Sequence, residues 1–263
     1  MRSRFPGVTV AACRTCGLSF LLPLPTAAEI DSSSLYEDEY FAGYARAGIT
    51  LPAEARQVPR RYRRRLRQAL PGGRPGRLLD VGPGHGSFLA YARDQGWHTF
   101  GVDISRHAVQ LARRLYDLEI ANGTLQAAAF PDDAFDLVHL SHVLEHVPDL
   151  RGTLGEVQRV LKPGGLVAIE VPNELDNLHA RVRRVARRVA PPPVPSTHLY
   201  FFTPRALRRA LVEAGFVRCR VRTLRDTADP LWWRRLAKRM LTIAETGPRM
   251  GPLIEGYGRK ASR

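Results

Sequence analysis

The strongest constraint on how this chain can fold is a glycine-rich turn that directly follows a short apolar segment. Residues 78–87 read Leu-Leu-Asp-Val-Gly-Pro-Gly-His-Gly-Ser, so Gly82, Pro83, Gly84 and Gly86 link a strand to the start of a helix. Glycines let the backbone turn tightly and approach a ligand without a Cβ atom in the way. The N–H groups and partial positive charge of the helix N-terminus can bind a carboxylate or phosphate. The turn therefore predicts a ligand site, although glycine-rich turns also form for packing alone.

Short apolar segments alternate with amphipathic segments from residue 77 to about residue 226. The predicted strands are Arg77–Val81, Phe100–Ile104, Phe135–Leu140 and Leu166–Val171. The predicted helices are Ser87–Gln95, His107–Tyr116, Leu154–Leu161 and a last one that starts at Pro204 with Thr203 as its N-cap and stops at Gly215. This alternation indicates an α/β fold with a doubly wound, mostly parallel sheet.

Two classes of ligand fit the turn, namely dinucleotides and S-adenosylmethionine. The dinucleotide fingerprint is Gly-x-Gly-x-x-Gly, and Ser87 stands where its third glycine is required. Asp103 ends the second strand at the distance expected for binding ribose hydroxyl groups, but both ligands contain a ribose. The order Gly-x-Gly-x-Gly, with Asp80 before it, favours S-adenosylmethionine, and an oxidoreductase is the alternative.

Five segments between about Cys13 and Phe216 carry a family resemblance. They read LLDVGPGHGSFL, GVDIS, FPDDAFDLVHLSHVLEHVPD, VLKPGGLVAIEVPN and HLYFFTPRALRRALVEAGF. With them the chain resembles the bacterial class I methyltransferases related to ubiquinone-biosynthesis O-methyltransferase and to sugar methyltransferases. The resemblance implies a Rossmann-like domain with S-adenosylmethionine as its cofactor.

The resemblance also implies roles for residues around the cofactor. Asp80 is expected near the amino group of the methionine part, and Ile104 is expected to pack on adenine. Thr124 and Leu125 occupy the loop that usually borders the adenine ring. Because an acidic residue often found near there is absent, adenine contacts are left to backbone groups.

Three histidines are candidates for a general base, which an alcohol or phenol acceptor would need besides in-line alignment. Ser141 and His142 follow the predicted strand Phe135–Leu140 and, by resemblance, face the sulfonium end of the cofactor. His146 lies four residues after His142, so both would face one side of a helix if a helix begins there. His198 begins a segment that approaches the acceptor in relatives. Each histidine could instead be structural, and we expect no metal, because neighbouring His and Glu residues do not specify a coordination geometry.

The chain divides into four predicted zones. Residues 1–50 form an arm, residues 51–76 a basic helical segment, residues 77–226 the S-adenosylmethionine-binding domain, and residues 227–263 a basic, Trp-containing C-terminal segment. Residues 173–200 are expected to form the acceptor lid, because they follow the last strong strand at the edge where α/β sheets bind ligands.

The arm contains a Cys-x-x-Cys pair, Cys13 and Cys16, that looks like half of a zinc ribbon. A structural zinc site needs four ligands, and Cys219 is the only other cysteine of the sequence. We therefore expect a degenerate knuckle, or a chain that starts too far downstream, rather than a zinc site within one chain. A redox pair is the less favoured interpretation, since the surrounding sequence does not resemble thioredoxin.

The net charge of +15 is concentrated in three basic stretches, at residues 60–70, 178–190 and 231–241. Each stretch alone is typical of a surface helix. Together they predict an anionic or membrane-surface partner, because Trp beside Lys and Arg is common in helices that lie on membranes. Nucleic acid is the rival partner. It is less favoured because the strand Phe135–Leu140 is followed by Ser-His-Val-Leu at residues 141–144 and not by the Asn/Asp-Pro-Pro-Tyr loop of base methyltransferases.

These features predict an O-methyltransferase that acts on a small molecule or a glycan, with lipid-linked acceptors included. A nucleic-acid (RNA) methyltransferase is the alternative, and a non-catalytic cofactor-binding scaffold is a third interpretation that the intact glycines and acids disfavour. The sequence has three cysteines and no apolar stretch of about 20 residues. We therefore expect a cytoplasmic protein, peripheral at a membrane if the basic stretches contact one. The acceptor and the oligomeric state stay open.

Overall fold

The fold is described from a computed structural model, which describes residues 8–26, 60–69, 74–174, 198–224 and 251–262. Two of the three basic stretches, at residues 178–190 and 231–241, lie outside the described residues, and so does most of the predicted acceptor lid. The Trp-containing helix expected after residue 227 also lies outside them.

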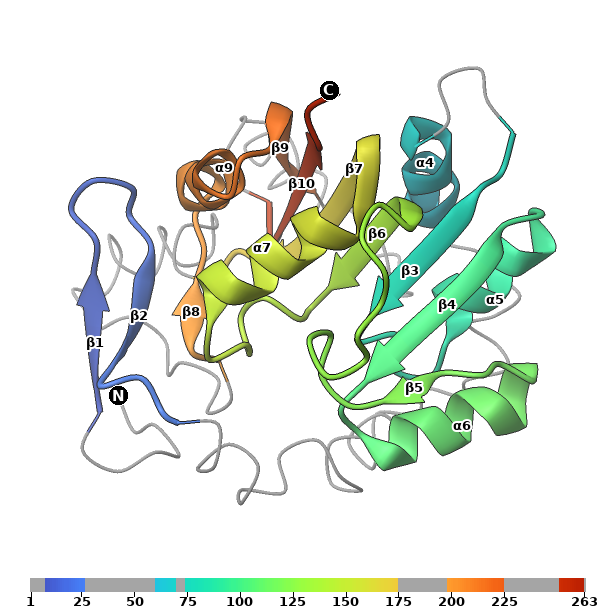
Figure 1. Ribbon diagram of the computed structural model, residues 1–263. Helices are drawn as coiled ribbons and strands as arrows, with labels where there is room; N and C mark the ends of the chain where they lie inside the picture. The colour runs from blue at the N-terminus through green and yellow to red at the C-terminus, as the bar shows by residue number, and fades with distance from the viewer. Residues whose placement is uncertain (1–7, 27–59, 70–73, 175–197, 225–250, 263) are drawn as a thin grey trace, which may run out of the picture.

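A seven-stranded sheet forms the centre of the molecule (Figure 1). Its strands, in spatial order, are β5 (Ala121–Asn122), β4 (His98–Asp103), β3 (Arg77–Val81), β6 (Phe135–Ser141), β7 (Leu161–Pro172), β10 (Leu253–Arg259) and β9 (Val217–Leu224). The first five strands are parallel, whereas β10 is antiparallel to both of its neighbours. The order reverses on either side of β3, so the predicted doubly wound, mostly parallel sheet is confirmed.

Adjacent residues of each strand point to opposite faces of this sheet. Because apolar side chains lie on both faces, helices cover both of them. Leu79 packs in a cluster with α7 (Leu150–Val160) and α9 (Pro204–Glu213). Its neighbour Leu78 packs in a different cluster with α4 (Arg60–Ala69) and α5 (Ser87–Asp94). The helix α6 (Arg106–Tyr116) packs beside α5. Apolar residues on both faces explain why the strands read as continuous apolar runs.

Most predicted elements are confirmed to within two residues, with two corrections. Helix α7 begins four residues earlier than predicted, because Asp149 caps it by accepting a hydrogen bond from the N–H of Gly152. Strand β7 starts at Leu161 instead of Leu166, because the Lys-Pro-Gly-Gly sequence forms an irregularity within the strand instead of a turn before it. Among the described residues, no helix is long and apolar enough to cross a membrane.

The predicted boundary at residue 226 needs correction, because β10 lies after it and fills the sheet between β7 and β9. The sequence Leu-Ile-Glu-Gly-Tyr-Gly-Arg looks like part of a Gly/Pro-rich end. Its glycine at 256 has a packing reason, since a Cβ atom there would lie 2.8 Å from a methyl carbon of Leu207 on α9. Residues 253–259 of the C-terminal segment are therefore part of the domain core.

The N-terminal arm forms a hairpin of β1 (Thr9–Ala12) and β2 (Ser19–Leu22), joined to the short strand β8 (Tyr200–Phe201) in a second sheet. Figure 1 shows this hairpin beside α9 and apart from the central sheet. Leu21 is buried in the same apolar cluster as α7 and α9. The arm thus packs against the segment that was predicted to approach the acceptor.

Candidate active site

The glycine-rich turn lies at the carboxyl edge of β3 and has the geometry that its sequence predicts. Gly82, Gly84 and Gly86 all have positive φ angles, of 66°, 56° and 83°. A Cβ atom on Gly82 would lie 2.6 Å from Val143 in the loop after β6, so this glycine permits close packing of two loops. A Cβ atom on Gly84 would meet nothing within 4 Å. The turn therefore presents open space at its middle glycine, where a ligand can approach the backbone.

Asp103 lies beside this turn at the end of β4. Its carboxylate accepts hydrogen bonds from the backbone N–H of Gly84 at 3.0 Å and of Ser105 at 2.9 Å. Burial raises the pKa of the Asp103 carboxyl, and these two hydrogen bonds offset part of the rise. The carboxylate can accept further hydrogen bonds, because an ionised carboxylate offers about four acceptor positions.

Ile104 follows Asp103 and is 47% exposed, which is unusual for a large apolar side chain at the edge of a core. Asn122, which the sequence analysis did not single out, donates hydrogen bonds from its amide nitrogen to the carbonyl oxygens of Asp103 and Ile104. Asn122 therefore fixes the backbone on which both predicted cofactor residues stand.

The two predicted adenine-loop residues have different environments. The hydroxyl of Thr124 accepts a hydrogen bond from the N–H of Ala127 and so stabilises the turn at 124–128. The side chain of Leu125 is 3% exposed and packs in the core. Only backbone groups of Leu125 can therefore border an adenine ring.

His142 stands at the carboxyl end of β6, but the segment after it is not helical. Residues 142–149 form bends and a turn at 144–146, and His142 itself has a left-handed φ of 57°. The predicted placement of His142 and His146 on one helical face is therefore wrong. A left-handed conformation costs about 1–2 kcal/mol for a residue with a Cβ atom. It is held here by the hydrogen bond from the His142 N–H to the Glu170 carbonyl oxygen at 2.9 Å.

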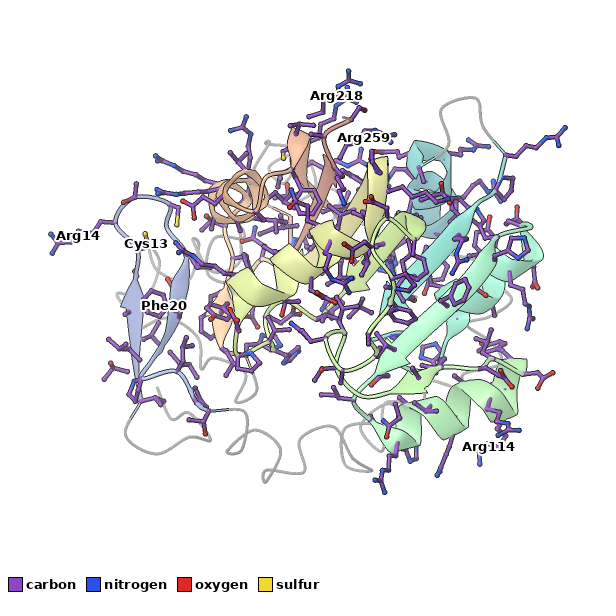
Figure 2. The ribbon with its side chains drawn as sticks, viewed as in Figure 1. Cys13, Arg14, Phe20, Arg114, Arg218 and Arg259 are labelled. Atoms are coloured by element: carbon purple, nitrogen blue, oxygen red, sulfur yellow. The ribbon has the colours of Figure 1, made fainter. Side chains whose placement is uncertain are left out.

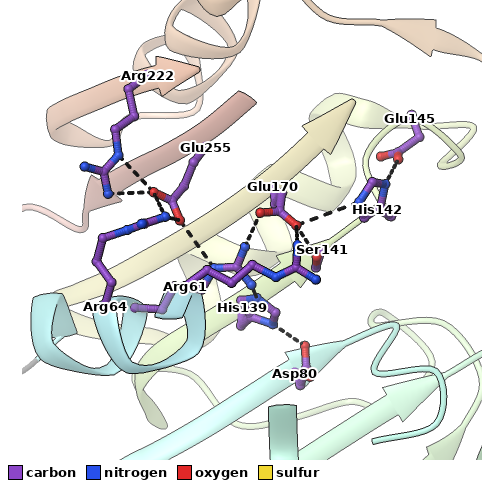
Figure 3. Close-up of polar contacts among 11 residues, drawn as sticks. Arg61, Arg64, Asp80, His139, Ser141, His142, Glu145, Glu170, Arg222 and Glu255 are labelled. Carbon is purple, nitrogen blue, oxygen red and sulfur yellow. Dashed lines mark hydrogen bonds and ion pairs between the residues drawn. The ribbon is translucent and has the colours of Figure 1, made fainter. Parts of the chain in front are cut away.

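His142 forms an ion pair with a buried carboxylate. Its Nδ1 atom lies 3.2 Å from Oε1 of Glu145, a residue that is fully buried, while the imidazole is 43% exposed (Figure 3). Burial alone would lower the pKa of His142, but the hydrogen bond and negative charge of Glu145 raise it overall. Conversely, burial would raise the pKa of Glu145, and His142 and His146 lower it. The other ring nitrogen, Nε2, lies 3.8 Å from Oε1 of Glu170, which is longer than a hydrogen bond, so Nε2 can still meet an acceptor.

The other two predicted histidines lie together on the far side of Glu145. Nε2 of His146 is 4.0 Å from the Glu145 carboxylate, and the rings of His146 and His198 are 4.6 Å apart. Nδ1 of His198 is 2.9 Å from the carboxylate of Glu174. One ligand atom each from Glu145, His146 and His198 lies within 4.8 Å of the others, so these three side chains could hold a metal ion. The sequence analysis expected no metal, and this group is a specific alternative.

A series of buried polar contacts connects strands β3, β6 and β7 with helix α4 (Figure 3). Asp80 accepts a hydrogen bond at 2.6 Å from Nδ1 of His139, and Nε2 of His139 lies 2.7 Å from a guanidinium nitrogen of Arg65. Because arginine can only donate, Nε2 must accept, which places the proton of a neutral His139 on Nδ1. Burial lowers the pKa of His139, consistent with this neutral form. Arg65 also donates to Glu170 at 2.6 Å.

The basic helix α4 provides most of the positive charge in this chain of contacts. Arg65 is 1% exposed, and Arg64 donates two hydrogen bonds to the carboxylate of Glu255 on β10, at 2.7 and 2.8 Å. Arg222 of β9 binds the same carboxylate. These arginines neutralise buried acids of the sheet. The first of the three basic stretches is therefore only partly available to the external anionic partner that the sequence analysis expected.

Arg61, on the same helix, reaches the predicted site. Its side chain is 37% exposed, and its guanidinium lies 3.8 Å from Oε1 of Glu170, the oxygen that also accepts from the hydroxyl of Ser141. The sequence offers one signal for this cluster, namely charged or polar residues inside buried strands, as Glu170 and His139 are. It offers none that separates Arg61 from the neighbouring arginines.

Comparisons with known proteins agree with this geometry. The sequence model of a family described as a methyltransferase domain matches residues 55–219. A ubiquinone biosynthesis O-methyltransferase from Thiobacillus denitrificans is 32% identical over 148 residues, which cover 53% of this chain and 63% of that protein. A sterol 24-C-methyltransferase from Gibberella zeae is 31% identical over 120 residues, covering 41% of this chain and 32% of that protein. The chain thus matches less than two thirds of the length of either relative.

The fold also has solved counterparts. The crystal structure of a SAM-dependent methyltransferase from Archaeoglobus fulgidus superposes with a TM-score of 0.57 at 20% sequence identity, and the match covers 85% of this chain and 100% of that one. At this level of identity, the likeness concerns the fold alone.

Proposed function

The chain belongs to the methyltransferase domain family, and from this we propose that it uses S-adenosylmethionine to methylate an oxygen atom of a small molecule or a glycan. The observation that carries the proposal is the set of residues that gather at the carboxyl edge of the sheet. There, the open turn at Gly84, the carboxylate of Asp103 and the exposed Ile104 lie on neighbouring strands, and the His142–Glu145 pair follows the next strand. Ligands of doubly wound sheets bind at this carboxyl edge.

The residues present fit S-adenosylmethionine. The open side of Gly84 admits the cofactor against the backbone, Asp103 keeps acceptor positions for ribose hydroxyl groups, and Ile104 offers an apolar surface for adenine. When bound, S-adenosylmethionine supplies an electrophilic methyl group on a sulfonium. Its carboxylate would be paired by the guanidinium of Arg61, the half-exposed cation next to Ser141 and Glu170. The expected contact of Asp80 with the amino group stays a prediction, since its carboxylate is occupied with His139.

His142 is the proposed general base. Glu145 orients the imidazole through Nδ1, and Nε2, which lies 3.8 Å from Oε1 of Glu170, is the nitrogen that would take the proton of an acceptor hydroxyl. Orientation of a histidine by a buried carboxylate also stabilises the imidazolium that forms. Only the neutral imidazole acts as a base, so the raised pKa of His142 predicts a rate that increases with pH through a midpoint above 6.5.

A divalent metal ion at Glu145, His146 and His198 is a second way to activate the acceptor. The observation in its favour is the convergence of these three ligand atoms within 4.8 Å. Such an ion would lower the pKa of a bound hydroxyl without a histidine base. Activity that survives thorough chelation and the substitution His146→Ala would favour His142 over the metal route.

The oxygen acceptor is supported by the base–carboxylate pair and by the O-methyltransferase among the relatives, whereas the sterol 24-C-methyltransferase shows that relatives also methylate carbon. Binding is tested by calorimetry with S-adenosylhomocysteine and, for comparison, a nicotinamide dinucleotide. Transfer is tested with isotope-labelled cofactor on panels of phenols, glycans, lipid-linked glycans and RNA. Tight dinucleotide binding without binding of S-adenosylhomocysteine would refute the cofactor, and labelling of RNA alone would refute the acceptor class.

A further inference from the structure

The turn between β1 and β2 contains Cys13, which Figure 2 shows at the tip of the N-terminal hairpin, and Cys16, whose side chain hydrogen-bonds to that of Cys13. The N–H of Gly17 donates to the carbonyl oxygen of Cys13 at 2.9 Å, and the N–H of Cys13 donates to the carbonyl oxygen of Leu18 at 2.8 Å. The hydroxyl of Thr203, at the start of α9, donates to the carbonyl oxygen of Cys16 at 3.2 Å. Two backbone hydrogen bonds therefore close the turn, and the hydroxyl of Thr203 links it to the start of α9.

This turn places hydrogen-bond donors around the sulfur of Cys13. The backbone N–H groups of Cys16 and Thr15 and the thiol of Cys16 all hydrogen-bond to it, and together they lower the pKa of the Cys13 thiol to about 7. On α9, Arg209 is the charged group that interacts with both cysteines, and it is itself paired with Glu213. Burial acts in the opposite direction at Cys219, whose pKa is raised. The chain thus contains one thiol with a lowered pKa, Cys13, and a half-buried thiol with a raised pKa, Cys219, for comparison.

A metal is the obvious alternative use of two neighbouring thiols, and the structure does not supply its remaining ligands. A structural zinc site needs four. Within the part of the chain that the structure describes, the one group of three or more side chains able to hold a metal is Glu145, His146 and His198, which does not include either cysteine. Two partly exposed thiols that hydrogen-bond to each other, without further ligands among the described residues, have the arrangement of a dithiol.

We propose that Cys13 and Cys16 are a reversible dithiol–disulfide pair, in which Cys13 is the attacking thiolate and a peroxide is the oxidant. The Cys13 sulfur attacks one peroxide oxygen, the O–O bond breaks, and Cys13 sulfenic acid and hydroxide form. The Cys16 thiol then attacks the Cys13 sulfur, the S–S bond forms, and water leaves. The two thiols lose two electrons and two protons in total, and hydrogen peroxide is reduced to two molecules of water. A dithiol reductant reverses the change.

The first experiment compares the thiols of the full chain under reducing conditions. Iodoacetamide at pH 7 should modify Cys13 about ten times faster than Cys219, because the thiolate is the reactive form. The gain is smaller than the difference in thiolate fraction, since nucleophilicity falls as the pKa falls. Peptide mass spectrometry measures both rates in one sample, so Cys219 is an internal control. Equal rates for the two cysteines would overturn the assignment of Cys13 as the attacking thiol.

The second experiment follows oxidation by hydrogen peroxide. We expect a Cys13–Cys16 disulfide that dithiothreitol reverses, both in the wild-type chain and in the matched control Cys219→Ser. In Cys16→Ser the sulfenic acid of Cys13 should accumulate and be trapped by dimedone. Oxidation beyond the sulfenic acid in the wild-type chain, without a disulfide, would refute the proposal. So would a stoichiometric metal in the purified protein that protects both cysteines from iodoacetamide until it is chelated.

Discussion

Removing the Arg65 guanidinium is the sharpest test of the buried charge network. Arg65 is 1% exposed and contacts His139 at 2.7 Å, Glu170 at 2.6 Å and Glu255 at 3.5 Å. In Arg65→Leu the buried carboxylate of Glu170 keeps the hydroxyl of Ser141 at 3.2 Å and the more distant Arg61 at 3.8 Å. Removing one partner of a buried ion pair costs about 3–5 kcal/mol, because the other charge remains buried without compensation.

A loss of about 3–5 kcal/mol is large compared with the roughly 5–15 kcal/mol that stabilises a typical domain. Urea denaturation of the wild-type chain and of Arg65→Leu measures the change in the free energy of unfolding. Arg63→Leu is the matched control, since Arg63 is exposed on the same helix and should change stability by no more than about 0.5 kcal/mol.

The double variant Arg65→Leu with Glu170→Leu separates a missing partner from a missing side chain. If the uncompensated Glu170 charge causes the loss, removing that charge as well should recover a large part of the stability. An Arg65→Leu variant within about 1 kcal/mol of the wild-type chain would refute the reasoning. A double variant that is less stable than Arg65→Leu by the full cost of a second buried deletion would refute it as well.

Four further predictions concern the cofactor and the base. Asp103→Ala should weaken S-adenosylhomocysteine binding by about 1.5–3 kcal/mol, the value of hydrogen bonds to a charged group, while calorimetry on the exposed-acid control Asp94→Ala shows no change. Gly82→Ala should lower both cofactor affinity and the midpoint of urea unfolding, since its Cβ atom would lie 2.6 Å from Val143; unchanged values would contradict the packing argument. His142→Ala should lower turnover about 10²–10⁴-fold at unchanged cofactor affinity. Glu145→Gln should move the midpoint of the pH–rate profile to lower pH, because the carboxylate charge that raises the pKa of His142 is gone; a midpoint that stays in place would exclude His142 as the base.

The cofactor half of the site was predictable because it is local in the sequence. Residues 78–87 and Asp103 belong to one strand–turn–helix–strand unit, so their spacing alone determines that the turn, the helix start and the acid meet at one edge. Helix α9 was predictable for the same reason, since Thr203 and Pro204 cap it by contacts within its first turn.

The acceptor half depended on the tertiary structure. Residues four apart suggested a helical pair of His142 and His146, but the bond from His142 to Glu170, on another strand, holds the backbone in a left-handed turn. The partners of Glu145 were also hidden, because His198 reaches it from a segment more than 50 residues away. No spacing rule connects residues that meet only after the chain has folded.

The same distinction applies to charge and to the sheet. The sequence by itself determined that helix α4 is basic, but the buried partners of Arg64 and Arg65 lie on strands more than 70 residues away. It also predicted four of the five parallel strands through their apolar runs, whereas the short strand β5 and the position of β10 between β7 and β9 were decided only by the tertiary structure. The apolar periodicity of a segment shows which of its side chains are buried. The long-range pairing of strands determines which other segment covers them.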